Sequence, residues 1–224
     1  MKGKTPREFY EEVGLKNVLD RRSNAETKKE ISYLKKFLSK EKRIRILDAA
    51  CGTGRISLPL AEAGYNISGI DISPNLLGYA KKEALQKKLK INFVEGDIRA
   101  LTFEDESFEC ILCLWSSFNE IYDLHDQIKT ICEMKRVLCD GGKVLIEMAK
   151  PERHAKDFIK GNLNLIRKIG NVNYFRAYGI ETMPGYSHNE KTLSNVMELS
   201  GVKNYRIFFD EFGGRERMLL QFNK

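Results

Sequence analysis

The chain has 224 residues, of which 42% are hydrophobic and 31% are charged, a composition typical of one soluble globular domain. No run approaches the roughly 20 apolar residues of a membrane span, and residues 1–20 lack the apolar core of a signal peptide. Lys plus Arg number 38 against 31 Asp plus Glu, a net charge of +7 that permits a nucleic-acid partner without favouring one. We therefore expect a single cytoplasmic domain over residues 1–224 that does not contact a membrane.

The five cysteines are an odd number, which indicates reduced thiols rather than a disulfide framework. Cys110 and Cys113 have the C-x-x-C spacing of zinc and redox sites, but they fall in an apolar run that predicts a strand. Residues three apart in a strand point to opposite faces, so we expect them to be buried core residues. The sequence predicts no metal site.

The N-terminal segment, residues 1–42, contains two helix starts of the capping-box type. They are Thr5–Glu8, with Pro6 at the first helical position, and Ser23–Glu26. We expect two helices here, forming a helical cap on the core.

Residues 43–150 alternate short apolar runs with helical patterns. The runs predict buried parallel strands, and the stretches between them predict helices. The expected strands are 44–50, 66–70, 91–95, 110–115 and 143–148, and the expected helices are 55–63, 74–88 and about 124–138. This alternation predicts an α/β fold with a doubly wound, mostly parallel sheet.

The remaining chain divides into an irregular part and a regular part. Residues 151–188 mix basic, aromatic and glycine residues, and we expect a small hairpin or a lid over a ligand site there. Residues 189–199 predict a helix, and the runs 205–209 and 218–222 flank two glycines. These runs predict an antiparallel hairpin at the sheet edge, which brings the sheet to seven strands.

The densest chemical signal is the sequence ILDAACGTGR at residues 46–55, where the first strand turns into the first core helix. Glycines at such a junction let a ligand approach the backbone, and a helix N-terminus presents free N–H groups. The pattern therefore predicts a cofactor site. A dinucleotide fingerprint needs a third glycine where this chain has Ser57, which disfavours a nicotinamide cofactor.

This loop resembles the first motif of the class I S-adenosylmethionine-dependent methyltransferases, a family with a Rossmann-like fold. The motif is an acidic residue followed by a glycine pattern, matched here by Asp48, Gly52 and Gly54, with Ala50 where the family usually has its first glycine. Four further segments resemble that family in the same order. They are residues 65–73, 94–98, 108–119 and 138–145, so the resemblance extends over about residues 44–150.

The resemblance implies S-adenosylmethionine as cofactor and S-adenosylhomocysteine as product. It implies that Asp71 accepts hydrogen bonds from the ribose hydroxyls and that Asp97 and Ile98 contact the adenine. The full implied cofactor set is Asp48, Ala50, Gly52, Gly54, Asp71, Ile72, Asp97, Ile98 and Leu114. Each carboxylate alone has a structural alternative as a loop organiser or helix cap, but three at successive strand ends favour a ligand site.

The acceptor side is less defined. In-line methyl transfer mainly requires alignment and exclusion of water, so the sequence predicts no catalytic residue. Candidate acceptor-binding residues are Tyr10, Trp115, Asn119, Glu147 and Arg176. Candidate bases near the fourth strand are residues 115–120, Tyr122 and His125. His125 is explained equally well as a surface residue at a helix start, and His188 as a residue of a helix-capping region.

The absence of certain motifs narrows the acceptor. The chain lacks the N/D-P-P-Y motif of enzymes that methylate amino groups of bases and glutamine, and the Pro-Cys or Thr-Cys nucleophile of cytosine C5 enzymes. We predict a small-molecule methyltransferase acting at nitrogen or oxygen. The alternatives are an RNA or protein methyltransferase, for which residues 167–178 offer basic and aromatic groups, or a cofactor-binding module without turnover. The sequence does not indicate an oligomeric state.

Overall fold

A seven-stranded sheet forms the centre of the structure, a computed structural model that describes residues 4–19, 23–38, 42–150, 163–177, 180–181 and 184–224. Its strands are β1 (Arg45–Ala49), β2 (Asn66–Asp71), β3 (Asn92–Glu95), β4 (Phe108–Cys113), β5 (Leu138–Met148), β10 (Tyr205–Phe212) and β11 (Arg215–Asn223). Their order is β10-β11-β5-β4-β1-β2-β3, and only β11 runs in the direction opposite to that of the other six strands. The predicted doubly wound, mostly parallel sheet with an antiparallel hairpin is confirmed.

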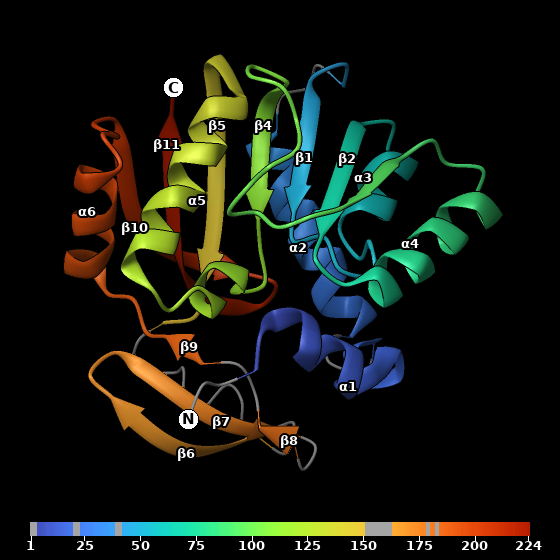
Figure 1. The fold of residues 1–224 in the computed structure, drawn as a ribbon. Coiled ribbons are helices and arrows are strands. Elements are labelled where there is room, and N and C mark those ends of the chain that lie inside the picture. The colour runs from blue at the N-terminus through green and yellow to red at the C-terminus, as the bar shows by residue number, and fades with distance from the viewer. Residues whose placement is uncertain (1–3, 20–22, 39–41, 151–162, 178–179, 182–183) are drawn as a thin grey trace.

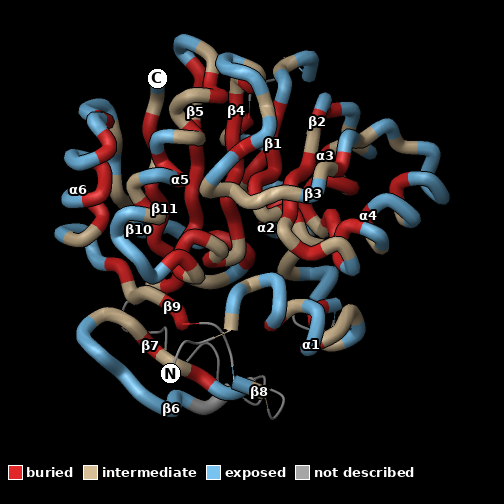
Figure 2. Tube along the Cα trace, in the orientation of Figure 1, coloured by how far each residue is buried: buried red, intermediate tan, exposed pale blue. Residues whose placement is uncertain are grey.

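Helices cover both faces of this sheet (Figure 1). One face packs against α2 (Asn24–Phe37) and α3 (Ser57–Glu62), and the other packs against α5 (Leu124–Val137) and α6 (Glu190–Leu199). The helix α4 (Pro74–Gln86) lies near β3. Figure 2 shows the resulting layering, with buried strands inside and exposed helix surfaces outside. None of the described helices is long and apolar enough to cross a membrane.

The two predicted N-terminal helices are present, but they lie against different parts of the core. The capping boxes are present, because Thr5 and Ser23 exchange hydrogen bonds with Glu8 and Glu26. Only α1 (Pro6–Leu19) lies beyond the carboxyl ends of the parallel strands (Figure 1). The second helix, α2, packs flat on the sheet, so the cap over the core consists of α1 alone.

Several element boundaries differ from the predictions for local reasons. The helix expected at 55–63 begins only at Ser57, because residues 52–56 form turns around the glycines. The strand expected to reach Trp115 ends at Cys113, because both Trp115 and Ser116 have left-handed backbones, with φ of 60° and 62°. Strand β5 begins before the expected turn at Gly141 and contains it as an irregularity in its pairing with β4.

Cys110 and Cys113 lie on opposite faces of β4, as predicted from strand geometry. Cys110 belongs to the apolar cluster beneath α2, whereas Cys113 belongs to the cluster beneath α5. Both thiols are fully buried, and burial raises the pKa of Cys110 to about 12. The pair is therefore part of the core on two sides of the sheet.

A second, small sheet lies beside α1 at the carboxyl ends of the parallel strands (Figure 1). It consists of β6 (Leu163–Ile169), β7 (Val172–Ala177), β8 (Ile180–Glu181) and β9 (Gly185–Tyr186). Phe175 of β7 is buried in one cluster with Phe9 and Val13 of α1. The small sheet falls in the segment predicted as a lid, of which residues 151–162 lie outside the described part of the chain.

Candidate functional site

A cavity opens at the carboxyl ends of β1, β2 and β4, where ligands bind in open α/β sheets. The other wall comes from Tyr10 and Val18 of the helix α1 and from Lys4, which precedes that helix. The predicted cofactor residues that line the cavity are Asp48, Ala50, Gly52, Asp71, Ile72, Asp97, Ile98 and Leu114. The structure thus gathers all of that set except Gly54 around one space.

The loop after β1 needs left-handed backbone at several positions. Ala50, Gly52 and Gly54 have φ of 65°, 53° and 74°. The value at Ala50 gives the physical reason why glycine suits this position, since the left-handed region costs an L-residue about 1–2 kcal/mol. An added Cβ at Gly54 would lie 3.2 Å from side-chain atoms of Leu58 and Phe93, so this glycine permits close packing rather than contact with a ligand.

Two buried carboxylates stand at the ends of β1 and β2. Asp48 accepts a hydrogen bond of 2.5 Å from the Ser57 hydroxyl, and burial raises its pKa to about 6. Asp71 accepts hydrogen bonds from the backbone N–H groups of Gly52 (2.7 Å) and Ser73 (2.9 Å), and burial also raises its pKa. Asp71 therefore ties the glycine loop to the end of the neighbouring strand while lining the cavity.

The third carboxylate, Asp97, is held by an arginine that sequence analysis did not identify. Arg99 donates to it from its backbone N–H (2.9 Å) and its guanidinium (2.6 Å), and also reaches Asp126 of α5 at 2.5 Å. Burial works to raise the pKa of Asp97, but these hydrogen bonds outweigh it and hold the pKa below its ordinary value. Asp97 thus remains a fixed, ionised acceptor on the cavity wall.

The wall opposite the glycine loop joins α1 to the loop after β4. The Tyr10 hydroxyl donates to Glu120 Oε1 at 2.7 Å, and both residues line the cavity. Trp115 also lines it, with the Arg55 guanidinium 5.5 Å from its ring centroid. Of the five predicted acceptor residues, Tyr10 and Trp115 therefore face the cavity.

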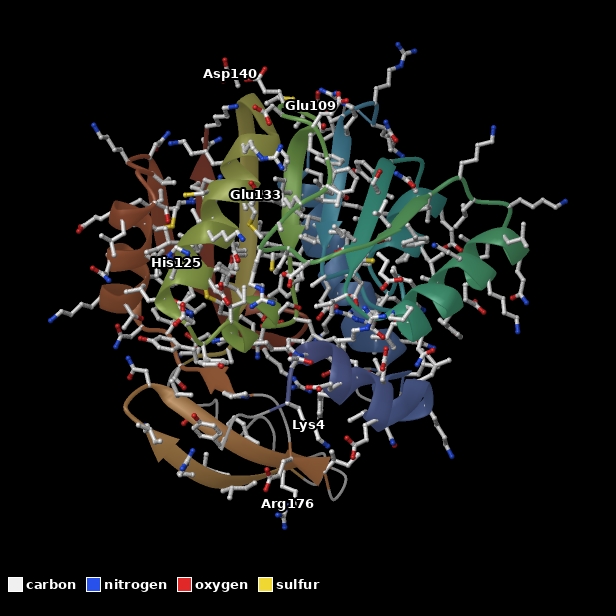
Figure 3. The ribbon with its side chains drawn as sticks, in the orientation of Figure 1. Lys4, Glu109, His125, Glu133, Asp140 and Arg176 are labelled. Carbon is white, nitrogen blue, oxygen red and sulfur yellow. The ribbon has the colours of Figure 1, made fainter. Side chains whose placement is uncertain are left out.

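Asn119 and Arg176, two other predicted acceptor residues, do not line the cavity. Asn119, in the short 3₁₀ helix η1 (Ser117–Glu120), donates to the carbonyl of Tyr186 at 2.7 Å, which ties η1 to the small sheet. Arg176 lies on β7 with an exposed side chain directed away from the main sheet (Figure 3), 3.7 Å from Glu181. The structure thus brings neither residue to the cavity wall, and their role in acceptor binding stays a prediction.

Glu147, the fifth predicted acceptor residue, does not line the cavity either. It is fully buried and forms an ion pair with Arg217 of β11. We predicted that Glu147 faces the ligand because it lies near the carboxyl end of a strand of this sheet. The partner Arg217 gave no sequence signal, because 70 residues separate the two.

The candidate bases are dispersed. Tyr122 lines the cavity, whereas His125 lies on α5 and does not (Figure 3). His188 is buried, with its ring centroid 5.3 Å from that of Phe118 and 4.6 Å from that of Tyr186. Neither histidine therefore lies on the cavity wall.

Known proteins resemble the region that supplies most of the cavity wall. Residues 46–142 match the methyltransferase domain family. The putative methyltransferase YqeM of Bacillus subtilis (strain 168) is 35% identical over 114 residues, which are 51% of this chain and 46% of that protein. The glycine/sarcosine N-methyltransferase of Aphanothece halophytica is 32% identical over 125 residues, 55% of this chain and 47% of that protein. The chain thus spans about half the length of the curated relatives it matches.

The fold as a whole has solved counterparts. The PH0226 protein of Pyrococcus horikoshii OT3 superposes with a TM-score of 0.74 at 20% identity, covering 91% of this chain and 93% of that one. At this identity the likeness concerns the fold. Together with the domain match, it confirms the predicted class I methyltransferase resemblance.

Proposed function

Because residues 46–142 match the methyltransferase domain family, we propose that this protein methylates a small molecule at nitrogen or oxygen, using S-adenosylmethionine. The observation that carries the proposal is the convergence of Asp48, Asp71 and Asp97 with the glycine loop on one cavity. Three carboxylates at three strand ends suit a ligand that carries hydroxyl and amino donors and a positive charge. S-adenosylmethionine, when bound, supplies an electrophilic methyl group on a sulfonium.

The residues of this chain divide the binding task between them. Asp71 has accepting capacity beyond its two backbone partners and would take hydrogen bonds from a ribose. Asp97, fixed by Arg99, would accept from an adenine amino group, while Ile72 and Ile98 offer apolar contacts. Asp48 adds negative charge in a buried setting, which favours a cationic ligand. The set fits the cofactor that the sequence resemblance implies.

The acceptor side of the cavity excludes water and orients a nucleophile. Tyr10 brings α1 against Glu120, so the helix closes the space beside the loop after β4. Trp115 and Tyr10 present aromatic surface there, and we propose both as acceptor contacts. An enclosed wall of this kind suits a small molecule, and the glycine/sarcosine N-methyltransferase among the relatives is named for small acceptors.

An RNA acceptor is the second candidate, because one specific surface favours it. On the small sheet, the Arg167 guanidinium lies 4.4 Å from the ring centroid of Tyr174, and Lys168 is exposed. Basic and aromatic side chains of this kind bind single-stranded nucleic acid.

We also propose a cytoplasmic location, since all five cysteines are free thiols.

Calorimetric titration tests the cofactor. We expect the purified protein to bind S-adenosylmethionine and S-adenosylhomocysteine but not NAD, and Asp71→Ala to fold yet bind both much more weakly. Binding of NAD alone would overturn the proposal, and full cofactor affinity in Asp71→Ala would refute the role of this residue.

Methyl transfer to metabolite and RNA pools at several salt concentrations then tests the acceptor. Transfer to an RNA should fall steeply as salt rises, because phosphate contacts release counterions, whereas transfer to a neutral small molecule should hardly change. Methyl incorporation confined to RNA and lost with salt would replace the small-molecule proposal.

A further inference from the structure

The loop between β4 and η1 has a backbone that needs outside support. Trp115 and Ser116 are consecutive, neither is glycine, and their φ angles are 60° and 62°. Isolated L-residues disfavour this region, and such conformations persist where the surroundings hold them. The same loop places Leu114 and Trp115 on the cavity wall. Whatever holds the loop therefore also sets the shape of the cavity.

A buried carboxylate on the neighbouring strand receives the backbone of both residues. Glu147 Oε2 accepts from the N–H of Trp115 at 2.5 Å and from the N–H of Ser116 at 3.3 Å. The N–H of Ser116 also lies 3.2 Å from the backbone carbonyl oxygen of Glu147. The left-handed pair is thus bound through its backbone to one residue of β5.

Arg217 of β11 completes the arrangement. Its guanidinium binds Glu147 Oε1 through Nε and donates to the Ser116 hydroxyl through Nη2. Leu219 pairs with Glu147 across the two strands, so Arg217, two residues along, shares the face of the sheet to which the Glu147 side chain points. Only the planar fork of an arginine presents donors to two partners in fixed directions, which a lysine ammonium does not.

We propose that Arg217 and Glu147 are positioning residues that fix the Trp115–Ser116 loop and, through it, the part of the cavity wall that Leu114 and Trp115 form. Neither residue lines the cavity, so both act through the loop. A buried ion pair often stabilises a fold no better than well-packed apolar residues, whereas its directed hydrogen bonds are what an apolar pair lacks. The link to methyl transfer rests on the proposed function, but the hold on the loop does not.

The test uses the fluorescence of Trp115, the sole tryptophan of the chain. The double variant Glu147→Leu/Arg217→Met replaces the ion pair with apolar side chains and removes the hydrogen bonds that the Glu147 and Arg217 side chains make to the loop. It keeps the bond from the Ser116 N–H to the backbone carbonyl of residue 147. We expect it to keep the far-ultraviolet circular dichroism and cooperative melting of wild type. Its Trp115 emission should shift to longer wavelength with stronger acrylamide quenching, and its Kd for S-adenosylhomocysteine should rise roughly ten-fold, which corresponds to about 1.4 kcal/mol.

Two further variants separate positioning from a merely structural effect. Glu147→Gln/Arg217→Met also lacks the charges but keeps an oxygen that accepts from the Trp115 N–H, so it should recover most of the wild-type emission and affinity. Glu216→Gln is the matched control, because Glu216 neighbours Arg217 on β11 and pairs at 2.5 Å with Lys150 away from the loop. It should leave both readouts unchanged.

Wild-type emission, quenching and affinity in the folded Leu/Met variant would overturn the proposal. Should that variant fail to fold, Ser116→Ala gives the decision, because it deletes only the hydroxyl that Arg217 holds. It should increase the quenching of Trp115, and unchanged quenching would equally overturn the proposal. If wild type binds no S-adenosylhomocysteine while the emission changes occur as expected, the proposed function fails and the positioning role stands.

Discussion

Replacing Asp48 by asparagine tests whether the cavity carries a desolvated charge that destabilises the empty protein. Burial raises the pKa of Asp48 from 3.8 to about 6, so the folded state binds this proton more tightly than the unfolded state does. Ionisation of Asp48 therefore lowers the free energy of unfolding. This loss of stability develops as the pH rises from about 4 through 6 and is absent below that range.

The size of the effect follows from the same two values. The difference between 3.8 and about 6 corresponds to about 3 kcal/mol at neutral pH, at about 1.4 kcal/mol per pKa unit. The asparagine side-chain oxygen still accepts from the Ser57 hydroxyl but carries no charge. We therefore expect Asp48→Asn to unfold at higher urea concentration than wild type at pH 7.5, by up to about 3 kcal/mol, and to match wild type near pH 3.5.

Urea unfolding of both proteins at intervals from pH 3.5 to 7.5 measures this difference. Every other titrating group is common to the two proteins, so the difference between their stability curves reports Asp48. The same variant should bind S-adenosylmethionine more weakly, because the cavity has lost a negative charge. Parallel stability curves across the whole pH range, or a variant less stable than wild type at pH 7.5, would refute the reasoning.

Three other substitutions test the remaining parts of the site. Ala50→Gly removes left-handed strain of about 1–2 kcal/mol and adds flexibility to the unfolded chain, so thermal unfolding should show a net stabilisation of about 0.5–1 kcal/mol; a lower melting temperature would contradict the assigned backbone. Gly54→Ala should destabilise by about 2–4 kcal/mol in urea unfolding, since its Cβ would crowd Leu58 and Phe93 at a left-handed position; wild-type stability would contradict that packing. Arg99→Met should raise the pKa of Asp97, because the hydrogen bonds from Arg99 hold it down. As the pH is lowered from 7.5 to 4.5, calorimetry should therefore show the variant losing cofactor affinity at a higher pH than wild type does. Identical affinity profiles for the two proteins would show that Arg99 does not set this pKa.

Local signals in the sequence predict most of the sheet and the cofactor side of the cavity. The apolar runs of β1 to β5 are short and continuous, which is the pattern of strands buried on both faces, and each carboxylate lies within two residues of the carboxyl end of its strand. The sharp turn after β1 follows from its glycines. These features depend on residues close together in the chain, which is why the motif order locates them.

The acceptor side depends on pairings between distant residues, which no local pattern contains. Glu147 lies near the carboxyl end of β5, at the edge of the sheet where the site lies. Its side chain is nevertheless held by Arg217, 70 residues further on. Asn119 likewise faces Tyr186 of the small sheet rather than the cavity. A polar residue near the carboxyl ends of the strands can therefore either bind a ligand or hold the loop that binds it, and the sequence alone does not distinguish the two roles.

The position of β11 also bears on the order in which the molecule assembles. This strand inserts between β10 and β5, and its Arg217 reaches Ser116 across 101 positions of the chain. Contacts that close such long loops form late in folding, because their entropy cost comes before their energetic return. The glycine loop and β2, whose contacts span about 20 residues, can form earlier. The part of the cavity formed by the glycine loop and β2 can therefore be organised before the wall formed by the loop after β4.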